Sequence, residues 1–190
     1  MKYFLEGSLV ALRPLFEADI RLLWQWLNDR EATYFMFYGQ RPQTEEQVRE
    51  HFMKQATNES NVLCIILNKK NARPIGFAGL YDLHFTARSA EFRVFIGEKK
   101  FWGKGFGTEV TELLTFYGFD RLNLNRIYLG VTSENKGGVK AYEKAGFKRE
   151  GILKDDIYRN SRYYDSIRMA ILRDNYYKTH YSAHKKRFSL

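Results

Sequence analysis

A glycine-rich turn followed by an amphipathic helix is the feature of this sequence that most constrains its fold. Residues 102–108 read Trp-Gly-Lys-Gly-Phe-Gly-Thr, and a strand-like run at 91–96 lies shortly before them. The helix is indicated by apolar residues that recur on one face, at Phe106, Val110, Leu113, Leu114 and Tyr117. Glycines let the backbone adopt positive φ, and the free N–H groups of a first helical turn attract negative charge. The turn therefore predicts an anion-binding site.

Two interpretations of this turn remain open from its residues alone. It could hold the diphosphate of a nucleotide-like cofactor, or it could be only a tight connection between a strand and a helix. The spacing excludes a P-loop, because no Gly-Lys-Ser/Thr follows four residues after a first glycine. It also departs from the Gly-x-Gly-x-x-Gly pattern of dinucleotide-binding folds. Residues further along the chain have to decide between the two.

The length and charge of the chain bound its organisation and partners. With 190 residues, 44% of them hydrophobic and 28% charged, we expect a single folded domain over 1–190. The net charge of +9 favours an anionic partner, such as nucleic acid, an anionic lipid surface or a phosphorylated small molecule. Part of this charge lies in a basic C-terminal tail at about 178–190, for which we expect a solvated segment.

The cysteine and histidine content narrows the chemistry. The single cysteine, Cys64, lies in the apolar run 62–67, so we expect a small core residue and neither a disulfide nor a nucleophile. No apolar run reaches the roughly 18 residues that cross a bilayer, and no signal-peptide pattern opens the sequence, so we expect a cytoplasmic protein without membrane contact. No metal is expected, because metal-ligand spacing is lacking at all four histidines: His51, His84, His180 and His184.

The order of predicted elements is that of an α/β fold. Strands are predicted at 8–13, 62–67, 74–80, 90–96, 126–131, 151–158 and 163–172. Helices are predicted at 17–28, from a capping box at Thr44 to about Ala56, after Gly105, and in a short segment that ends at Gly146. Trp26 lies off the apolar stripe of its helix, so it is either partly exposed or packed against a neighbouring loop. The aromatic segment 29–42 is either the wall of a substrate pocket or a loop that covers the core.

A second motif identifies the family that this sequence resembles. Asn135 is followed seven residues later by Tyr142, and then by Lys144 and Gly146-Phe147. Together with the glycine turn, this pattern resembles the GNAT superfamily of acetyl-CoA-dependent N-acetyltransferases. More narrowly, Ile96-Gly97-Glu98 followed by Trp102-Gly103-Lys104-Gly105 resembles the branch of the ribosomal-protein N-terminal acetyltransferases and the spermidine acetyltransferase. The chain departs from the family at Gly137-Gly138, where the second position more often carries Ala or Ser, and we expect a looser helix start there.

The resemblance implies a fold and a cosubstrate. The fold is the GNAT acyl-CoA N-acyltransferase fold of the α/β (α+β) class. It has a central mixed, mostly antiparallel sheet of about seven strands, with 91–96 and 126–131 as a parallel pair that splays apart, and about four flanking helices. Acetyl-CoA is the expected cosubstrate. The residues expected to bind it are Phe95, Ile96, Gly103, Lys104, Gly105, Phe106, Gly107, Thr108, Asn135 and Lys144.

The resemblance also implies catalytic roles. Tyr142 matches the general acid of the family, which protonates the leaving thiolate; the alternative is a tyrosine that only packs between helix and sheet. Glu91 is the first candidate for a general base, and its alternative is a strand carboxylate paired with an arginine. His84 and Asp82 are weaker candidates for the base. Asn135 is expected to contact the pantetheine, to cap the following helix, or both.

The expected activity is transfer of the acetyl group to a primary amine by direct attack in a ternary complex. The acceptor stays open between a protein N-terminus and a small-molecule amine such as a polyamine or an amino sugar. Acidic residues could attract a polyamine, whereas the net charge of +9 argues against a polycation; these acids are Glu31, Glu45, Glu46 and Glu50. The alternative function is a non-catalytic acyl-CoA-binding protein that binds RNA or an anionic surface. For the enzyme we expect no nucleic-acid partner, and the aromatic hairpin 151–172 is a candidate homodimer edge.

Overall fold

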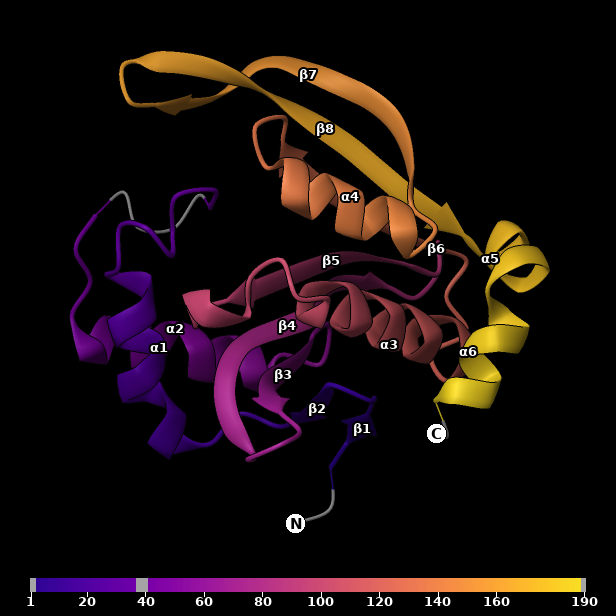
Figure 1. Ribbon diagram of the computed structural model, residues 1–190, viewed down its shortest axis with the longest axis horizontal. Helices are drawn as coiled ribbons and strands as arrows, with labels where there is room; N and C mark the ends of the chain where they lie inside the picture. The colour runs from indigo at the N-terminus through magenta and orange to yellow at the C-terminus, as the bar shows by residue number, and fades with distance from the viewer. Residues whose placement is uncertain (1–2, 37–40, 189–190) are drawn as a thin grey trace.

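The computed structural model describes residues 3–36 and 41–188, which form an eight-stranded sheet in the order β1-β2-β3-β4-β5-β6-β8-β7. Figure 1 shows this sheet running through the molecule, with the long β7–β8 hairpin at one edge. The strands are β1 (Leu5–Glu6), β2 (Val10–Arg13), β3 (Val62–Asn68), β4 (Arg73–His84), β5 (Ser89–Ile96), β6 (Arg126–Thr132), β7 (Lys148–Arg159) and β8 (Arg162–Leu172). The described residues also form six α-helices: α1 (Ile20–Leu27), α2 (Glu45–Thr57), α3 (Phe106–Asp120), α4 (Lys136–Lys144), α5 (Arg173–Thr179) and α6 (Tyr181–Arg187).

Among the described strands, β5 and β6 are the one parallel pair, and they separate along their length. Their register holds for three positions, from Ser89 opposite Arg126 to Glu91 opposite Tyr128. Beyond Glu91 the two strands continue to Ile96 and Thr132 without pairing to each other. The predicted splayed pair and mixed, mostly antiparallel sheet are thus confirmed. The described residues form eight strands and six α-helices, where about seven and about four were expected.

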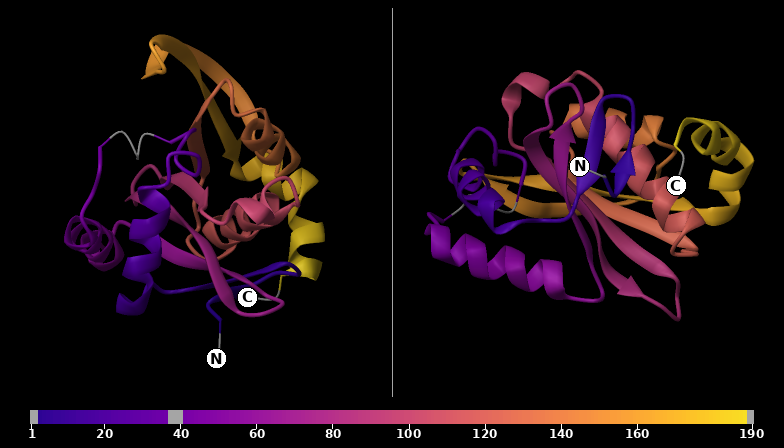
Figure 2. Two further views of the ribbon diagram at one scale, coloured as in Figure 1. Left: turned by 60° about the vertical axis from the view of Figure 1, so that its left-hand side comes forward. Right: turned by 90° about the horizontal axis from the view of Figure 1, so that it is seen from below.

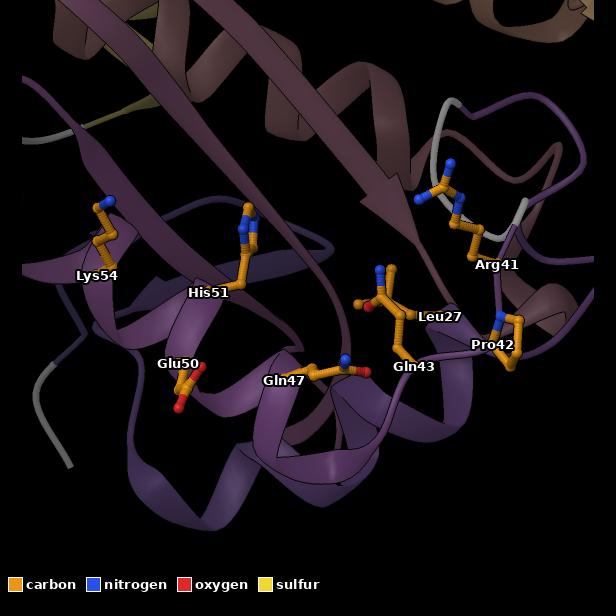
Figure 3. Close-up of a pocket in the computed structure, with 8 residues that line it drawn as sticks. All are labelled: Leu27, Arg41, Pro42, Gln43, Gln47, Glu50, His51 and Lys54. Carbon is orange, nitrogen blue, oxygen red and sulfur yellow. The ribbon is translucent and has the colours of Figure 1, made fainter.

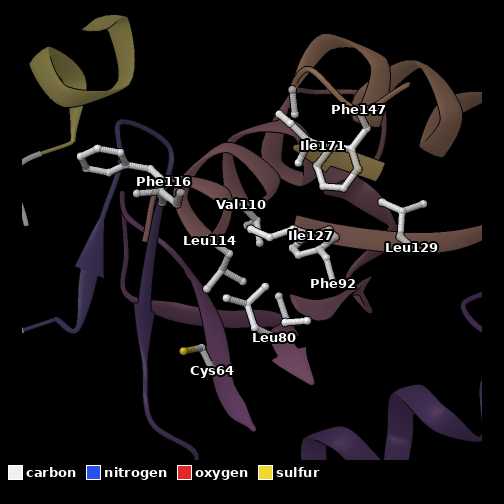
Figure 4. Close-up of a cluster of buried hydrophobic side chains, with 14 of the residues drawn as sticks. Cys64, Leu80, Phe92, Val110, Leu114, Phe116, Ile127, Leu129, Phe147 and Ile171 are labelled. Carbon is white, nitrogen blue, oxygen red and sulfur yellow. The ribbon is translucent and has the colours of Figure 1, made fainter. Parts of the chain in front are cut away.

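Helices cover both faces of the sheet and divide the core in two. α3 and α4 pack on one face, where Leu80, Phe92 and Ile127 belong to one buried cluster (Figure 4). α1 and α2 lie on the other face (Figure 2). There Phe77 and Phe95 belong to a second buried cluster. Because side chains alternate along a strand, β5 contributes to both clusters and lies between them.

Local sequence signals are confirmed at two helix and turn positions. Thr44 Oγ1 accepts a hydrogen bond from the Gln47 N–H at 3.2 Å, and Gln47 Oε1 accepts one from the Thr44 N–H at 2.9 Å, which completes the predicted capping box. The predicted hairpin between β7 and β8 turns at Asn160 and Ser161, both with positive φ. Such a two-residue turn matches the twist of the paired strands.

Trp26 is only 6% exposed, so of the two alternatives, partial exposure and packing against a neighbouring loop, the second is confirmed. Its ring lies 6.4 Å from that of Phe95, and its Nε1 donates to Glu98 at 3.3 Å. It therefore packs against the chain that follows β5, next to the glycine turn.

The expectation of a solvated C-terminal tail is wrong. Residues 173–187 form α5 and α6, which pack on α3. Tyr176 lies 4.7 Å from Phe119 and Phe188 lies 6.2 Å from Phe116, measured between ring centroids. Four aromatic or imidazole rings recur every four residues through the two helices and line the side packed on the core, and the prediction missed this period because it treated histidine as polar. These residues are Tyr176, His180, His184 and Phe188.

His184 is expected to make the stability of the protein depend on pH. Burial, assisted by His180 and Arg187, lowers the pKa of His184 from 6.5 to about 4, so the folded state favours the neutral ring. The unfolded chain takes up its proton near pH 6.5, and stability is therefore full above that pH and lost as the pH falls towards 4. Urea unfolding should show a loss of about 2 kcal/mol from this residue between pH 7 and pH 5. A His184→Gln variant should lose correspondingly less over the same interval, and an unchanged pH dependence would contradict this assignment.

Candidate active site

A cavity of about 610 Å³ opens where β5 and β6 separate. Its walls come from the segment after α1, the end of β5, the glycine turn, and the start and one face of α4. The lining residues are Ala32, Phe35, Met36, Val94, Phe95, Ile96, Phe101, Trp102, Gly103, Gly105, Gly107, Thr108, Glu134, Asn135, Lys136, Gly137, Gly138, Lys140, Ala141, Tyr142 and Lys144. The cavity thus joins both sequence motifs, which are a strand and a helix apart in the chain.

The glycine turn presents a helix N-terminus to this cavity. Gly105 is the N-cap of α3 at φ 86°, a left-handed conformation that favours glycine, and no side chain caps the first turn. Trp102 fixes the turn to the sheet, because its Nε1 donates to the carbonyl of Ile96 at 2.7 Å. The free N–H groups of this turn therefore face a space that can hold a phosphate.

The register of β5 distinguishes between the two backbone groups predicted to bind the cofactor. The Gly97 N–H donates to the Ile75 carbonyl of β4 at 2.9 Å. Because hydrogen-bonding direction alternates along an antiparallel pair, the Phe95 N–H faces β4, whereas the Ile96 N–H faces the splay. Both residues line the cavity, but Ile96 is the one whose N–H is directed into it.

Asn135 caps α4, as one of its predicted roles required. Its Oδ1 accepts from the Gly138 N–H at 2.8 Å. A Cβ on Gly138 would lie 2.7 Å from Asn135 Nδ2, so glycine leaves the room that this cap needs. The contact of Asn135 with pantetheine stays a prediction.

Three lysines of α4 line the cavity at four-residue spacing: Lys136, Lys140 and Lys144. Sequence reasoning singled out only Lys144 of these. Of the other predicted cofactor-binding residues, Lys104 and Phe106 do not line the cavity. The ring of Phe106 instead packs against Phe101 at 4.8 Å.

Tyr142 lines the cavity and also packs against the hydrophobic core. Its ring meets Phe92 edge-on at 6.1 Å and lies 6.2 Å from Phe147. Burial raises the pKa of its hydroxyl from 10 to about 12. The group therefore keeps its proton throughout the neutral range and can donate it inside the cavity.

Glu91 lies outside the cavity lining, at the last position where β5 still pairs with β6. Its Oε2 accepts from Arg93 Nε at 2.9 Å, and Arg93 also pairs with Asp82 at 3.4 Å. The arginine-paired strand carboxylate, which was the alternative interpretation, is thus what the structure shows. His84 accepts a backbone hydrogen bond from Ala87 at 3.0 Å and also lies outside the lining. The role of Glu91 as general base stays a prediction.

Sequence reasoning missed Glu134 in the cavity wall, although it directly precedes Asn135 of the recognised motif. It also named the aromatic segment 29–42 only as a possible pocket wall. Phe35 of that segment lines the cavity, which supports the pocket interpretation. Phe37, Tyr38 and Gly39, named in the same prediction, lie outside the described residues.

A second cavity of about 500 Å³ lies between α1 and α2 and shares no lining residue with the first (Figure 3). Its walls carry mixed charges and no glycine turn; they are Leu27, Arg41, Pro42, Gln43, Gln47, Glu50, His51 and Lys54. Desolvation and the nearby Arg93 and Lys54 lower the pKa of His51. Nothing in this cavity resembles a phosphate-binding turn.

The described residues also bear on the metal site and the membrane-spanning segment that were not expected. Within residues 3–36 and 41–188, no group of three His, Cys, Asp or Glu side chains is placed to hold a metal ion. No helix in the same described parts of the chain is long and apolar enough to span a membrane. The expectation that the protein needs no metal stays a prediction.

Comparison with known proteins assigns this geometry to a family. A model of the acetyltransferase (GNAT) domain matches residues 10–148. A spermidine N(1)-acetyltransferase from Vibrio cholerae serotype O1 is 32% identical over 173 residues, which cover 90% of this chain and 96% of the relative. The enzyme of the same description from Escherichia coli strain K12 is 30% identical and covers 90% of each chain.

Solved structures show the same likeness. The crystal structure of spermidine N-acetyltransferase from Vibrio cholerae in complex with CoA and spermine superposes with a TM-score of 0.81. Its sequence is 31% identical, and the match covers 90% of this chain and 99% of that one. A second structure, of the spermidine/spermine N-acetyltransferase from that organism in complex with manganese ions, has a TM-score of 0.75 at 30% identity and covers 91% and 98% of the two chains.

Proposed function

The chain belongs to the GNAT family of acetyltransferases, and from this membership we propose that its acceptor is a polyamine such as spermidine. It is an acetyl-CoA-dependent N-acetyltransferase, as predicted, and not the non-catalytic binding protein that was the alternative. The choice of a polyamine as the acceptor goes one step beyond the acetyltransferase activity. It is supported by relatives about 30% identical over nine-tenths of the chain that are spermidine N-acetyltransferases.

The observation that carries the proposal is the lining of the cavity, which includes the glycine turn, Glu134 and the segment after α1. The glycine turn fits acetyl-CoA, because its free helix N–H groups line the cavity and can hold a phosphate. Three lysines of α4 also line the cavity, where their positive charge favours an anionic coenzyme. Glu134 supplies a carboxylate for a cationic acceptor.

Acetyl-CoA supplies the acetyl group as a thioester, and its sulfur leaves as a thiolate. In the mechanism that we propose, the Ile96 N–H hydrogen-bonds to the thioester carbonyl and stabilises the charge that develops on its oxygen. Tyr142 donates its proton towards the departing sulfur. Glu91 is retained as the candidate base that accepts a proton from the amine through water, since its carboxylate lies outside the cavity wall.

Direct attack by the amine agrees with the state of the single cysteine. Cys64 is 2% exposed, and burial raises the pKa of its thiol to about 12. A thiol that is neither ionised nor accessible is unsuited to carry an acyl group. We therefore propose that both substrates are bound together when the acetyl group moves. A homodimer and a cytoplasmic location, both expected from the sequence, stay predictions.

Acceptor specificity can be measured by release of the CoA thiol from acetyl-CoA with a panel of amines. The panel contains spermidine, spermine, an amino sugar and a peptide with a free N-terminus. We expect the highest kcat/KM with spermidine or spermine. A peptide or amino sugar that is at least tenfold better would contradict the polyamine proposal and leave the acetyltransferase assignment intact.

A further inference from the structure

An ion pair joins two segments beside the cavity. Glu134, in the connection between β6 and α4, and Arg159, at the tip of β7, approach to 3.7 Å between Oε2 and Nη2. Their side chains are 29% and 14% exposed. Oε2 of Glu134 is nevertheless inaccessible to solvent and has no hydrogen-bond partner in the structure. Nε and Nη1 of Arg159 are also inaccessible to solvent and have no hydrogen-bond partner.

The surroundings of Arg159 account for its own two unpartnered nitrogens. The guanidinium carbon lies 4.9 Å from the ring centroid of Tyr34, 5.8 Å from that of Phe35 and 5.6 Å from that of Tyr164. Aromatic faces attract a guanidinium and can replace part of its hydration. Asn160, the next residue, donates to the Tyr34 hydroxyl at 3.2 Å, so the hairpin tip is held against the segment after α1 (Figure 1).

For Oε2 of Glu134, the neighbouring cation is Nη2 of Arg159, which at 3.7 Å is too distant to donate a hydrogen bond. A buried carboxylate oxygen without a donor is costly, and this one belongs to a residue that lines the cavity. The Glu134 side chain is 29% exposed, so its carboxylate can gain a donor from a ligand in the cavity. A positively charged amine supplies several N–H donors and the charge that a carboxylate prefers.

We propose that Glu134 holds a second, non-reacting ammonium group of the acceptor, and that Arg159 tunes how strongly it does so. This inference rests on the proposed polyamine acceptor. Tyr142 lies seven residues beyond Asn135, or about 10 Å along α4. An acceptor that reaches from the thioester to Glu134 is thus a long amine with a charge remote from its reacting end. Arg159 repels that charge and partly neutralises Glu134, so it limits the affinity.

Two variants test the pair, each with a matched control. Glu134→Gln removes the charge and keeps the shape. Its control Glu143→Gln removes an exposed carboxylate from α4, the helix that follows Glu134, where it pairs with Arg149. Arg159→Met removes the charge and leaves a long side chain between the rings. Its control is Arg162→Met, at the other end of the same turn and over the face of Tyr164.

KM and kcat are measured for spermidine, for the monoamine n-butylamine and for acetyl-CoA, together with Tm. Glu134→Gln should raise the KM for spermidine about tenfold, because a contact between opposite charges is lost from a cavity of reduced dielectric. The kcat/KM for n-butylamine and the KM for acetyl-CoA should change less than twofold. Arg159→Met should lower the KM for spermidine several-fold, and both control variants should stay within twofold of the wild type.

The possible outcomes distinguish the role of Glu134 and Arg159 from the proposed polyamine acceptor. A wild-type enzyme that prefers an acceptor other than a polyamine contradicts the proposed function, and the pair is then judged on that acceptor. An unchanged KM of Glu134→Gln for the best acceptor overturns the inference. So does a loss that is equal for spermidine and n-butylamine and that is accompanied by a lower Tm, since this would mark Glu134 as only structural.

Discussion

Tyr142→Phe is expected to lower kcat by roughly 10²- to 10⁴-fold, which is the range for loss of a positioned general acid. Tyr142 lines the cavity, and because burial raises the pKa of its hydroxyl to about 12, the group stays protonated throughout the neutral range. Phenylalanine keeps the ring contacts with Phe92 and Phe147, so the fold should be unaffected. The binding of acetyl-CoA, followed by calorimetry, should change less than twofold.

Tyr117→Phe is the matched control for this variant. Tyr117 lies on α3, its pKa is also raised by burial, and it does not line the cavity. Its kcat should equal that of the wild type. A Tyr142→Phe enzyme that turns over at the wild-type rate would remove Tyr142 from the acid role. A wild-type rate that falls as the pH rises from 8 to 10 because a tyrosine ionises would conflict with the raised pKa.

Glu109→Ala is expected to cost about 3 to 5 kcal/mol of unfolding free energy, because it leaves three backbone N–H donors without their acceptor, at about 1 to 3 kcal/mol for each buried donor. Glu109 is 1% exposed in the first turn of α3. Its carboxylate accepts from the N–H groups of Ser8, Leu9 and Val10 at 2.9, 2.6 and 2.9 Å. It also pairs with Arg187 of α6, so one side chain ties the first strands and the last helix to α3.

The neighbouring residue Glu112 provides the control for Glu109. It binds the same Arg187 at 2.6 Å but receives no backbone N–H group from the β1–β2 connection. Glu112→Ala should therefore cost only about 1 kcal/mol, in the range of partly exposed ion pairs. Urea unfolding of both variants at pH 7 measures the difference. Equal losses would show that the ion pair with Arg187, and not the backbone contacts, carries the effect.

The parts of the fold that were predictable have local causes. The glycine turn, the capping box at Thr44 and the hairpin turn at 160–161 each depend on residues within a few positions of one another. The spacing from Asn135 to Tyr142 is likewise local, since it spans one helix. These signals are sufficient to order the elements, and the family resemblance that they carry implied a cosubstrate site between the splayed strands.

The missed features depend on contacts between distant parts of the chain. Glu109 meets Ser8 from 101 positions away, and Asn160 meets Tyr34 from 126 positions away. No local sequence pattern predicts such a contact, because the sequence does not distinguish a buried carboxylate from a solvated one. The acceptor end of the site is built in this way, from the segment after α1 and the β7–β8 hairpin, which is why Arg159 was not foreseen.

Hydrogen–deuterium exchange with and without acetyl-CoA tests most directly whether the cavity at the splayed strands is the cosubstrate site. Bound acetyl-CoA should slow the exchange of amides that it covers, and the account predicts protection at 103–108, at Ile96 and around the start of α4. The second cavity between α1 and α2 should exchange as before. Protection confined to residues 41–54, with 94–108 unchanged, would contradict the account.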